Sequence, residues 1–205
     1  MKEKIDFNFD DGSKLFLTSD SHWGHDRIIE FCKRPFKNVE EMNYRMIENW
    51  NNKVPYDGIV FHLGDFAWGG YNFWKTIRDQ LNGKIILIKG NHDEKNLNDT
   101  GAKELFEDVR YQMKIRVEGR AVYLNHYPFL CYSGTYRDAK ALVYQAFGHV
   151  HSGPNSKGLD SERLNVLFPT QYDVGVDNNN YEPISWAEFN EKIGKQLLKS
   201  KFESK

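Results

Sequence analysis

The chain has 205 residues, of which 40% are hydrophobic and 15% aromatic, with 28 basic and 29 acidic side chains. This length suits one domain of ordinary size, and we expect residues 1–205 to form a single domain. A formal net charge of -1 argues against a protein that coats nucleic acid by charge alone, because such binding needs a basic surface. No segment reaches the length of a membrane span and no signal peptide is visible, so we expect a cytoplasmic protein without a membrane partner. Cys32 and Cys131 lack metal-type spacing and are expected to be buried thiols without a disulfide.

The first half of the chain has the pattern of an α/β protein. Polar and apolar residues alternate over 5–9, and a second apolar segment covers 14–19, so we expect the chain to open with a β-hairpin. Helical spacing of apolar residues predicts a short helix starting near Arg27 and longer ones over 39–51 and 71–81. Short, nearly all-apolar strands are predicted between and after these helices, over 59–63 and 84–89. This order is typical of a parallel sheet covered by helices.

The second half is richer in predicted strands. Segments 111–117 and 121–125 flank a Glu-Gly-Arg turn and predict a hairpin. The remaining expected elements are a helix over 136–142, strands over 143–147, 163–167 and 172–176, and a C-terminal helix over 185–199. Ser185 and Glu188 have the spacing of a capping box at the start of that last helix.

Polar residues stand directly after five of the predicted strands. They are Asp20 and His22, Asp65, Asn91 and His92, His126, and His149 and His151. Because ligands of open α/β sheets bind beyond the carboxyl ends of the strands, we expect these side chains to share one site. Carboxylate and amide oxygens mixed with imidazoles suit manganese, iron, zinc or nickel better than calcium. These eight side chains exceed the needs of one ion, so seven of them divided between two ions that share one carboxylate are the economical interpretation.

Each of these clusters also has an ordinary structural explanation. Gly64 and Asp65 alone would be read as a turn and a helix cap, and His126 alone as a core or surface histidine. His62 lies inside an apolar strand and is interpreted as structural. The joint occurrence of the clusters, each after an apolar strand, favours a metal site.

The five motifs Asp-x-His, Gly-Asp, Gly-Asn-His-Asp, His and Gly-His-x-His, all between residues 20 and 151, resemble those of the calcineurin-like metallophosphoesterase superfamily. The small, compact bacterial and phage-type members are the most similar. The resemblance implies an α/β fold of the four-layer α/β/β/α sandwich type, with mixed sheets flanked by helices. It further implies the following ligands: Asp20, His22, Asp65 and His151 for one ion, and Asp65, Asn91, His126 and His149 for the other. The segment after Gly64-Asp65 lacks the second Asp and the Arg of the superfamily's protein phosphatases, so protein dephosphorylation is not expected.

The function expected is metal-dependent hydrolysis of a phosphate ester, with a phosphodiester of a small nucleotide or similar molecule favoured over a monoester. Two divalent ions, manganese before iron, zinc or nickel, would lower the pKa of a shared water far below its value in bulk water, and the bridging hydroxide would attack phosphorus. His92, oriented by Asp93, would face the substrate and protonate the leaving group. His25 and Arg27 are candidate contacts for a substrate phosphate. Trp23, Lys33, Arg34, Trp68 and Tyr127 are further candidates for a substrate-contacting rim, but for most of them the favoured interpretation is an ordinary core or surface side chain.

Two other functions stay open. A nuclease or RNA-processing phosphoesterase would use the same chemistry, but the near-neutral charge weighs mildly against an extended nucleic-acid partner. A non-catalytic scaffold that binds proteins through the same fold would be expected to have lost some ligand positions, and none is missing here.

Overall fold

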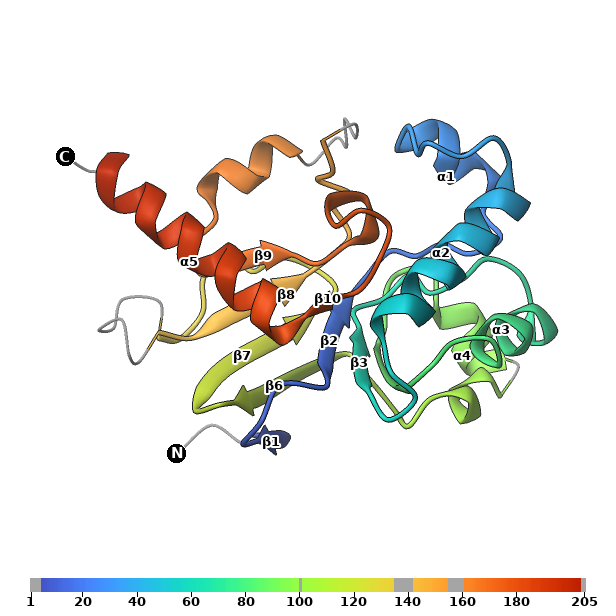
Figure 1. Ribbon diagram of the computed structural model, residues 1–205, viewed down its shortest axis with the longest axis horizontal. Helices are drawn as coiled ribbons and strands as arrows, with labels where there is room; N and C mark the ends of the chain where they lie inside the picture. Colours follow the sequence, from blue (N-terminus) through green and yellow to red (C-terminus); the bar gives the residue numbers. More distant parts are fainter. Residues whose placement is uncertain (1–4, 100, 135–141, 155–160, 204–205) are drawn as a thin grey trace.

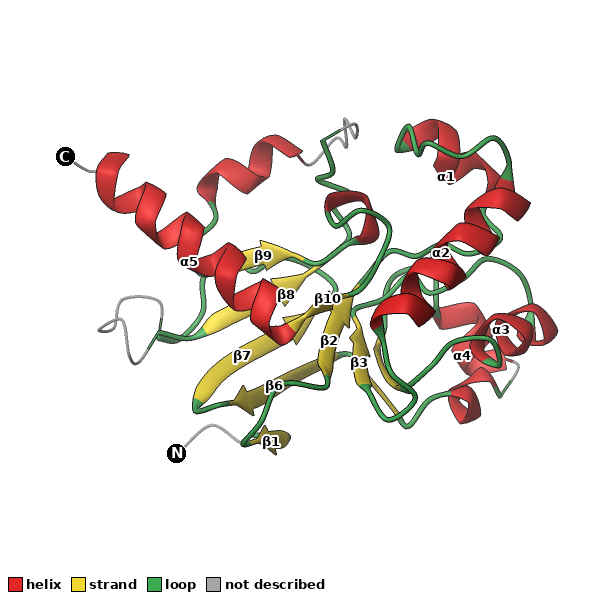
Figure 2. Ribbon diagram, viewed as in Figure 1, coloured by secondary structure: helices red, strands yellow, loops and turns green. Residues whose placement is uncertain are grey.

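The computed structural model describes residues 5–99, 101–134, 142–154 and 161–203. Within these residues ten strands form two five-stranded mixed sheets (Figures 1 and 2). The first sheet consists, in spatial order, of β1 (Phe7–Phe9), β6 (Gln112–Val117), β7 (Arg120–Asn125), β8 (Tyr144–Phe147) and β9 (Gln171–Asp173). The second sheet consists of β10 (Ile184–Ser185), β2 (Leu15–Thr18), β3 (Ile59–His62), β4 (Lys84–Ile88) and β5 (Asp108–Arg110). The α-helices are α1 (Asp26–Phe31), α2 (Val39–Lys53), α3 (Tyr71–Arg78), α4 (Glu94–Asp99) and α5 (Trp186–Glu203), with 3₁₀ turns η1 (Ala102–Leu105), η2 (Ser161–Val166) and η3 (Val176–Asn178).

The two sheets share a buried core, and helices flank them. Leu17 and Phe61 of the second sheet belong to one buried cluster with Ile115 and Leu124 of the first. Because side chains alternate along a strand, neighbours such as Val60 point the other way, into a second cluster with α1, α2 and α3. Helices α1 to α4 lie on one side of the molecule beside β3, whereas α5 contacts β2, β10 and β9 (Figure 1). The predicted fold class, two mixed sheets flanked by helices, is therefore confirmed.

Two predicted elements were wrong. The chain does not open with a hairpin, because β1 pairs in parallel with β6 of the first sheet and β2 pairs with β3 of the second. Alternation in 5–9 correctly indicates a half-buried strand but does not identify its partner, and Phe7 and Phe9 pack their rings on Phe61 instead. The segment predicted as a strand over 163–167 lies mostly in η2.

Other predictions hold. Strands β6 and β7 form the expected antiparallel hairpin. At α5 the Ser185 N–H donates to Glu188 Oε2 at 2.7 Å, and the Glu188 N–H donates back to Ser185 Oγ at 3.3 Å, which is the predicted capping box. The helix predicted over 136–142 falls almost wholly outside the described residues, and α4, η1 and β5 were not predicted.

Candidate metal centre

The candidate ligands gather where the carboxyl ends of the two sheets meet. Strands β2, β3 and β4 are parallel neighbours in one sheet, and β7 and β8 are parallel neighbours in the other. Asp20, Asp65 and Asn91 follow the first three strands, and His126 and His149 follow the other two. The sheets are joined at this edge, because the His149 N–H donates to Asp20 Oδ2 at 2.9 Å. A turn after one sheet thereby contacts a ligand carried by the other.

Two glycines allow the chain ends to approach this closely. A Cβ at Gly148 would lie 2.1 Å from Ser19 Oγ and 2.3 Å from Asp20 Oδ2. A Cβ at Gly90 would lie 2.2 Å from Asp65 Oδ1. Any other residue at either position would displace a candidate ligand, which explains why the motifs contain glycine there.

Most of the candidate ligands have a strained backbone. Five of the seven lie in the left-handed region: Asp20 (φ 57°), His22 (51°), Asp65 (54°), His149 (72°) and His151 (45°). Residues other than glycine adopt this region at a cost of about 1–3 kcal/mol each, and such residues concentrate at functional sites. The chain is therefore folded here to aim side chains inward at the expense of backbone energy.

Asp65 lies at the centre of the cluster. Its Oδ2 is 3.4 Å from His22 Nε2, 3.6 Å from His126 Nε2 and 3.9 Å from His92 Nε2. Its Oδ1 accepts the backbone N–H of His92 at 3.0 Å, which fixes the carboxylate plane. One carboxylate oxygen thus lies between a histidine of one predicted ligand set and a histidine of the other.

The hydrogen bonds of His126 leave a lone pair directed at the centre. Its Nδ1 lies 2.7 Å from the Leu63 carbonyl oxygen, which can only accept, so Nδ1 carries the proton. In a neutral ring the Nε2 lone pair then faces Asn91 Oδ1 at 3.0 Å, with the Tyr127 hydroxyl 3.4 Å from the same oxygen. With the amide in this orientation two acceptors face each other, and a cation bound by both would stabilise them, whereas a rotated amide would donate to the ring instead.

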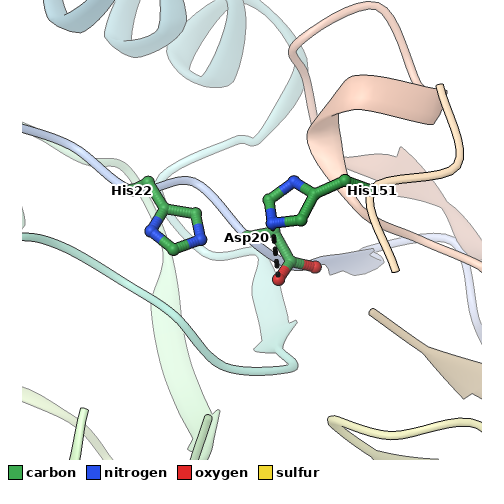
Figure 3. Close-up of side chains that lie close together, drawn as sticks. All are labelled: Asp20, His22 and His151. Atoms are coloured by element: carbon green, nitrogen blue, oxygen red, sulfur yellow. Dashed lines mark ion pairs between the residues drawn. The ribbon is translucent and has the colours of Figure 1, made fainter. Parts of the chain in front are cut away.

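His151 is held from behind by two buried charges. The ring Nδ1 lies 2.7 Å from Asp177 Oδ2, and its Nε2 points toward Asp20 Oδ1 at 3.9 Å (Figure 3). Arg34 pairs with both oxygens of Asp177, at 2.8 and 2.9 Å, and also donates to the backbone carbonyls of Asp20 and Ser21. The Arg34 and Asp177 side chains are 0% and 1% exposed. A carboxylate that orients a ligating histidine in this way is the usual support of a metal site.

The electrostatics of the cluster favour a bound cation. Burial lowers the pKa of His22 well below its usual value, aided by the nearby His151, so the ring is neutral and can ligate. Burial raises the pKa of Asp65, because the protein surrounds this carboxylate with too little positive charge. Asp20 Oδ1 and His22 Nε2 are buried without a hydrogen-bond partner. Figure 3 shows the rings of His22 and His151 facing each other beside Asp20.

The described residues also form three groups of closely spaced donors. They are Asp20, His22 and His151; Asp20, Asp65 and His126; and Cys32, His151 and Asp177, each with ligand atoms within 4.8 Å of one another. Unpaired donors, a neutral imidazole and a destabilised carboxylate together fit a site for divalent ions.

Asp93 has contacts that differ from the expected ones. Its carboxylate accepts three backbone N–H groups, from Asp65, Phe66 and Gly90, at 2.8 to 2.9 Å, and no hydrogen bond joins it to the His92 ring. Burial and the charge of Asp65 raise the pKa of Asp93 to about 6. Asp93 therefore fixes the backbone that carries Asp65 instead of orienting His92.

Of the residues expected to contact the substrate, His92 and His25 lie beside the cluster of candidate ligands, whereas Arg27 makes no hydrogen bond or ion pair with it. The His92 ring is partly exposed beside Asp65 and Trp68, and the His25 ring packs edge-on against Trp68 at 4.5 Å and lies 5.6 Å from His22. Burial lowers the pKa of His25, with His92 adding to the effect. Arg27 is exposed on α1 and makes no hydrogen bond or ion pair with another described residue.

Two of the five candidate rim residues are core residues, which agrees with the ordinary interpretation of them. Trp23 and Arg34 are buried and cannot contact a substrate, whereas Trp68 and Tyr127 are exposed beside the cluster. Arg34 and Asp177 support the site from inside, a role that the sequence analysis missed. The sequence did contain a signal for Asp177, because an apolar run precedes this carboxylate as it precedes the candidate ligands.

The sequence matches the calcineurin-like phosphoesterase family over residues 13–177. The chain belongs to this family. An uncharacterised protein of Methanocaldococcus jannaschii is 47% identical over 83 residues, which are 40% of this chain and 47% of that protein, so the match spans less than half of the archaeal relative. The Gene 66 protein of Mycobacterium phage L5 is 30% identical over 169 residues, which are 68% of this chain and 78% of the phage protein.

One solved structure shows the same fold. The crystal structure of a protein of unknown function from Aquifex aeolicus superposes with a TM-score of 0.62 at 24% identity, covering 86% of this chain and 97% of that one. A Pseudomonas putida nuclease gives a TM-score of 0.44 at 19% identity, covering 68% and 61%. The family comprises metal-dependent phosphoesterases, which accords with the donor set described above. None of the described helices has both the length and the hydropathy that a membrane span requires.

Proposed function

We propose that this phosphoesterase uses two divalent ions to hydrolyse a phosphodiester of a small nucleotide or similar molecule. The observation that carries the proposal is the position of Asp65 Oδ2, within 3.4 Å of His22 Nε2 and 3.6 Å of His126 Nε2. A single carboxylate between two histidines that belong to different donor groups can bridge two ions.

The proposed ligand sets follow from these positions. The first ion would be held by Asp20, His22, Asp65 and His151, and the second by Asp65, Asn91, His126 and His149. Manganese is the favoured ion, with iron, zinc or nickel as alternatives, because the set mixes imidazole with carboxylate and amide oxygens. When bound, two such ions would lower the pKa of a shared water and neutralise charge on the phosphoryl oxygens.

The remaining roles belong to the protein's own side chains. His92 is the proposed proton donor to the leaving oxygen, because its ring is open to solvent and its Nε2 lies 3.9 Å from Asp65 Oδ2. Its backbone N–H holds Asp65, so the proton donor and the bridging carboxylate are positioned by one turn. Asp93 supports that turn through its three backbone hydrogen bonds. His25, which shares the Trp68 ring with His92, is the proposed contact for a substrate phosphate oxygen, and Arg27 would have to reach the substrate from the outer face of α1.

The cellular setting is also a proposal. Both cysteines are unpaired; Cys32 is buried as expected, whereas Cys131 is exposed, so the expectation of a buried thiol was wrong there. We place the protein in the reducing cytoplasm, where free thiols persist.

Turnover of model substrates tests the proposal. The full chain is assayed with bis-p-nitrophenyl phosphate and with p-nitrophenyl phosphate in the presence of Mn²⁺, Ni²⁺, Zn²⁺ or Mg²⁺. We expect metal-dependent hydrolysis that is faster with the diester, and fastest with Mn²⁺. Hydrolysis of the monoester alone would refute the diesterase assignment, and no hydrolysis of either ester with any of the four ions would refute the enzymatic function.

A further inference from the structure

A cavity of about 360 Å³ opens beside the candidate metal centre. His149 and Tyr127 form the wall that it shares with the centre, and their rings lie 4.6 Å apart in an edge-to-face arrangement. The rest of the wall is apolar and consists of Pro128, Leu130, Val150, Leu164, Val166 and Leu167. Among the described residues, no Lys, Arg, Asp or Glu lines this cavity.

Part of the apolar lining is exposed instead of packed in the protein core. Leu130 is 74% exposed and Val166 is 64% exposed, although each is large and apolar. They come from separate segments, one after β7 and the other at the end of η2, yet they border one hollow. Convergence of exposed apolar side chains on a concave site next to catalytic groups is typical of a small-molecule pocket.

The geometry points to an aryl subsite, in which this cavity binds an uncharged aromatic group of the phosphate ester. This inference rests on the proposed phosphoesterase function and adds the chemical class of one of the groups esterified to the phosphate. If the phosphorus of an ester lies against Asn91 and His149, one of its ester substituents can reach the cavity, because the His149 ring borders both the candidate metal centre and the cavity. Tyr127 offers a ring edge or face to a flat group, and its hydroxyl is directed toward Asn91 Oδ1.

The lining also disfavours charged substituents of the ester. A second phosphate or a charged sugar acid would be desolvated there without a charged partner. A volume of about 360 Å³ is near the lower limit of ligand pockets, so it suits one ring system. The aromatic group could be attached directly to the ester oxygen or be the base of a nucleoside, and the two differ in their distance from phosphorus.

Paired inhibitors test the subsite. The Mn²⁺-loaded full chain is assayed with bis-p-nitrophenyl phosphate, and competition is measured with phenylphosphonate against methylphosphonate, and with adenosine 5′-phosphate against ribose 5-phosphate. Within each pair the phosphonate or phosphate group is the same and only one member carries an aromatic group, so the ratio of the two inhibition constants separates binding in the cavity from binding at the metal centre. We expect the aromatic member of at least one pair to bind at least about tenfold more tightly. The pair that shows this preference identifies how the aromatic group is attached.

Matched variants assign the preference to the cavity. Leu130→Asn and Val166→Asn change polarity at exposed positions, and each should bring that ratio close to one. Leu198→Asn is the control, because Leu198 is 58% exposed on α5 and does not line the cavity, so the ratio should stay as in the unmodified protein. Ratios near one in both pairs, or a preference that persists in both cavity variants, would overturn the aryl subsite while hydrolysis proceeds. Absence of any metal-dependent hydrolysis would instead overturn the proposed function and the subsite with it.

Discussion

Replacing Asp177 by asparagine removes one charge from the buried chain of contacts that runs from Arg34 to His151. The Arg34 guanidinium would then remain in the interior without a counter-charge, since the two side chains are 0% and 1% exposed. Removing one partner of a buried pair costs about 3–5 kcal/mol, because the remaining charge is desolvated and unpaired. The carboxylate is ionised in the folded protein: burial raises its pKa, but Arg34 and His151 outweigh burial and hold the pKa below its usual value.

The same change should also weaken metal binding. Asp177 holds the His151 ring at Nδ1, at 2.7 Å, so asparagine would loosen its orientation. Loss of such a partner lowers metal affinity about 10- to 100-fold. Urea unfolding of the metal-free protein, followed by the fluorescence of buried tryptophans such as Trp50 and Trp74, measures the first effect, and titration calorimetry with Mn²⁺ measures the second.

A double variant separates the two effects. Arg34→Met with Asp177→Leu removes both charges, and buried pairs replaced by apolar residues often lose little stability. We expect at least half of the lost stability to return, while metal affinity stays low because leucine cannot hold the His151 ring. Asp79→Asn, in the exposed pair with Lys75, is the matched control and should not change stability measurably. A loss below about 1 kcal/mol in Asp177→Asn, or full metal affinity in the double variant, would refute this reasoning.

Three further predictions follow from single positions. Gly148→Ala should lower the free energy of unfolding by about 1–3 kcal/mol and reduce metal binding, because its Cβ would lie 2.3 Å from Asp20 Oδ2. Gly194→Ala is the control and should be neutral or stabilising, because no neighbouring group lies within 4 Å of its Cβ. Equal effects of the two changes in thermal unfolding would contradict this prediction. Burial lowers the pKa of His62 to about 3, so below pH 6.5 the unfolded chain binds a proton that the folded chain does not. The metal-free protein should therefore lose about 2 kcal/mol more stability than His62→Gln between pH 6.5 and 5, and parallel losses in denaturant titrations would count against a neutral His62. His25→Ala should raise KM for bis-p-nitrophenyl phosphate with little change in kcat, and an unchanged KM would remove His25 from substrate binding.

Short-range pattern predicted the parallel part of the fold well. Strands β2, β3 and β4 are nearly continuous apolar runs separated by amphipathic helices, and only a helix-covered parallel sheet buries both faces of such strands. The partner of β1 was not predictable, because alternation in Phe7 and Phe9 is compatible with any half-buried edge. Its actual partner, β6, lies far along the chain and is selected by packing on Phe61.

The candidate ligands were predictable for a different reason. Each follows a strand, and strand direction alone brings Asp20, Asp65 and Asn91 to one edge of the sheet. The supporting pair was only partly predictable: the apolar run before Asp177 signals a carboxylate at this edge, but Arg34 is separated from it by 143 residues and an arginine beside a helix is usually exposed. Local pattern therefore identified the side chains at the centre but not the buried charges that orient them.

The central claim is that Asp65 bridges two ions, and the number of ions bound per chain tests it most directly. Metal analysis after Mn²⁺ loading and removal of free ions should give two ions per chain in the unmodified protein and in His92→Ala, which should lose turnover about 10²- to 10⁴-fold while keeping its metal. Asp65→Asn should fall below one ion per chain and lose turnover as well. One ion per chain in the unmodified protein, or two ions in Asp65→Asn, would contradict the account.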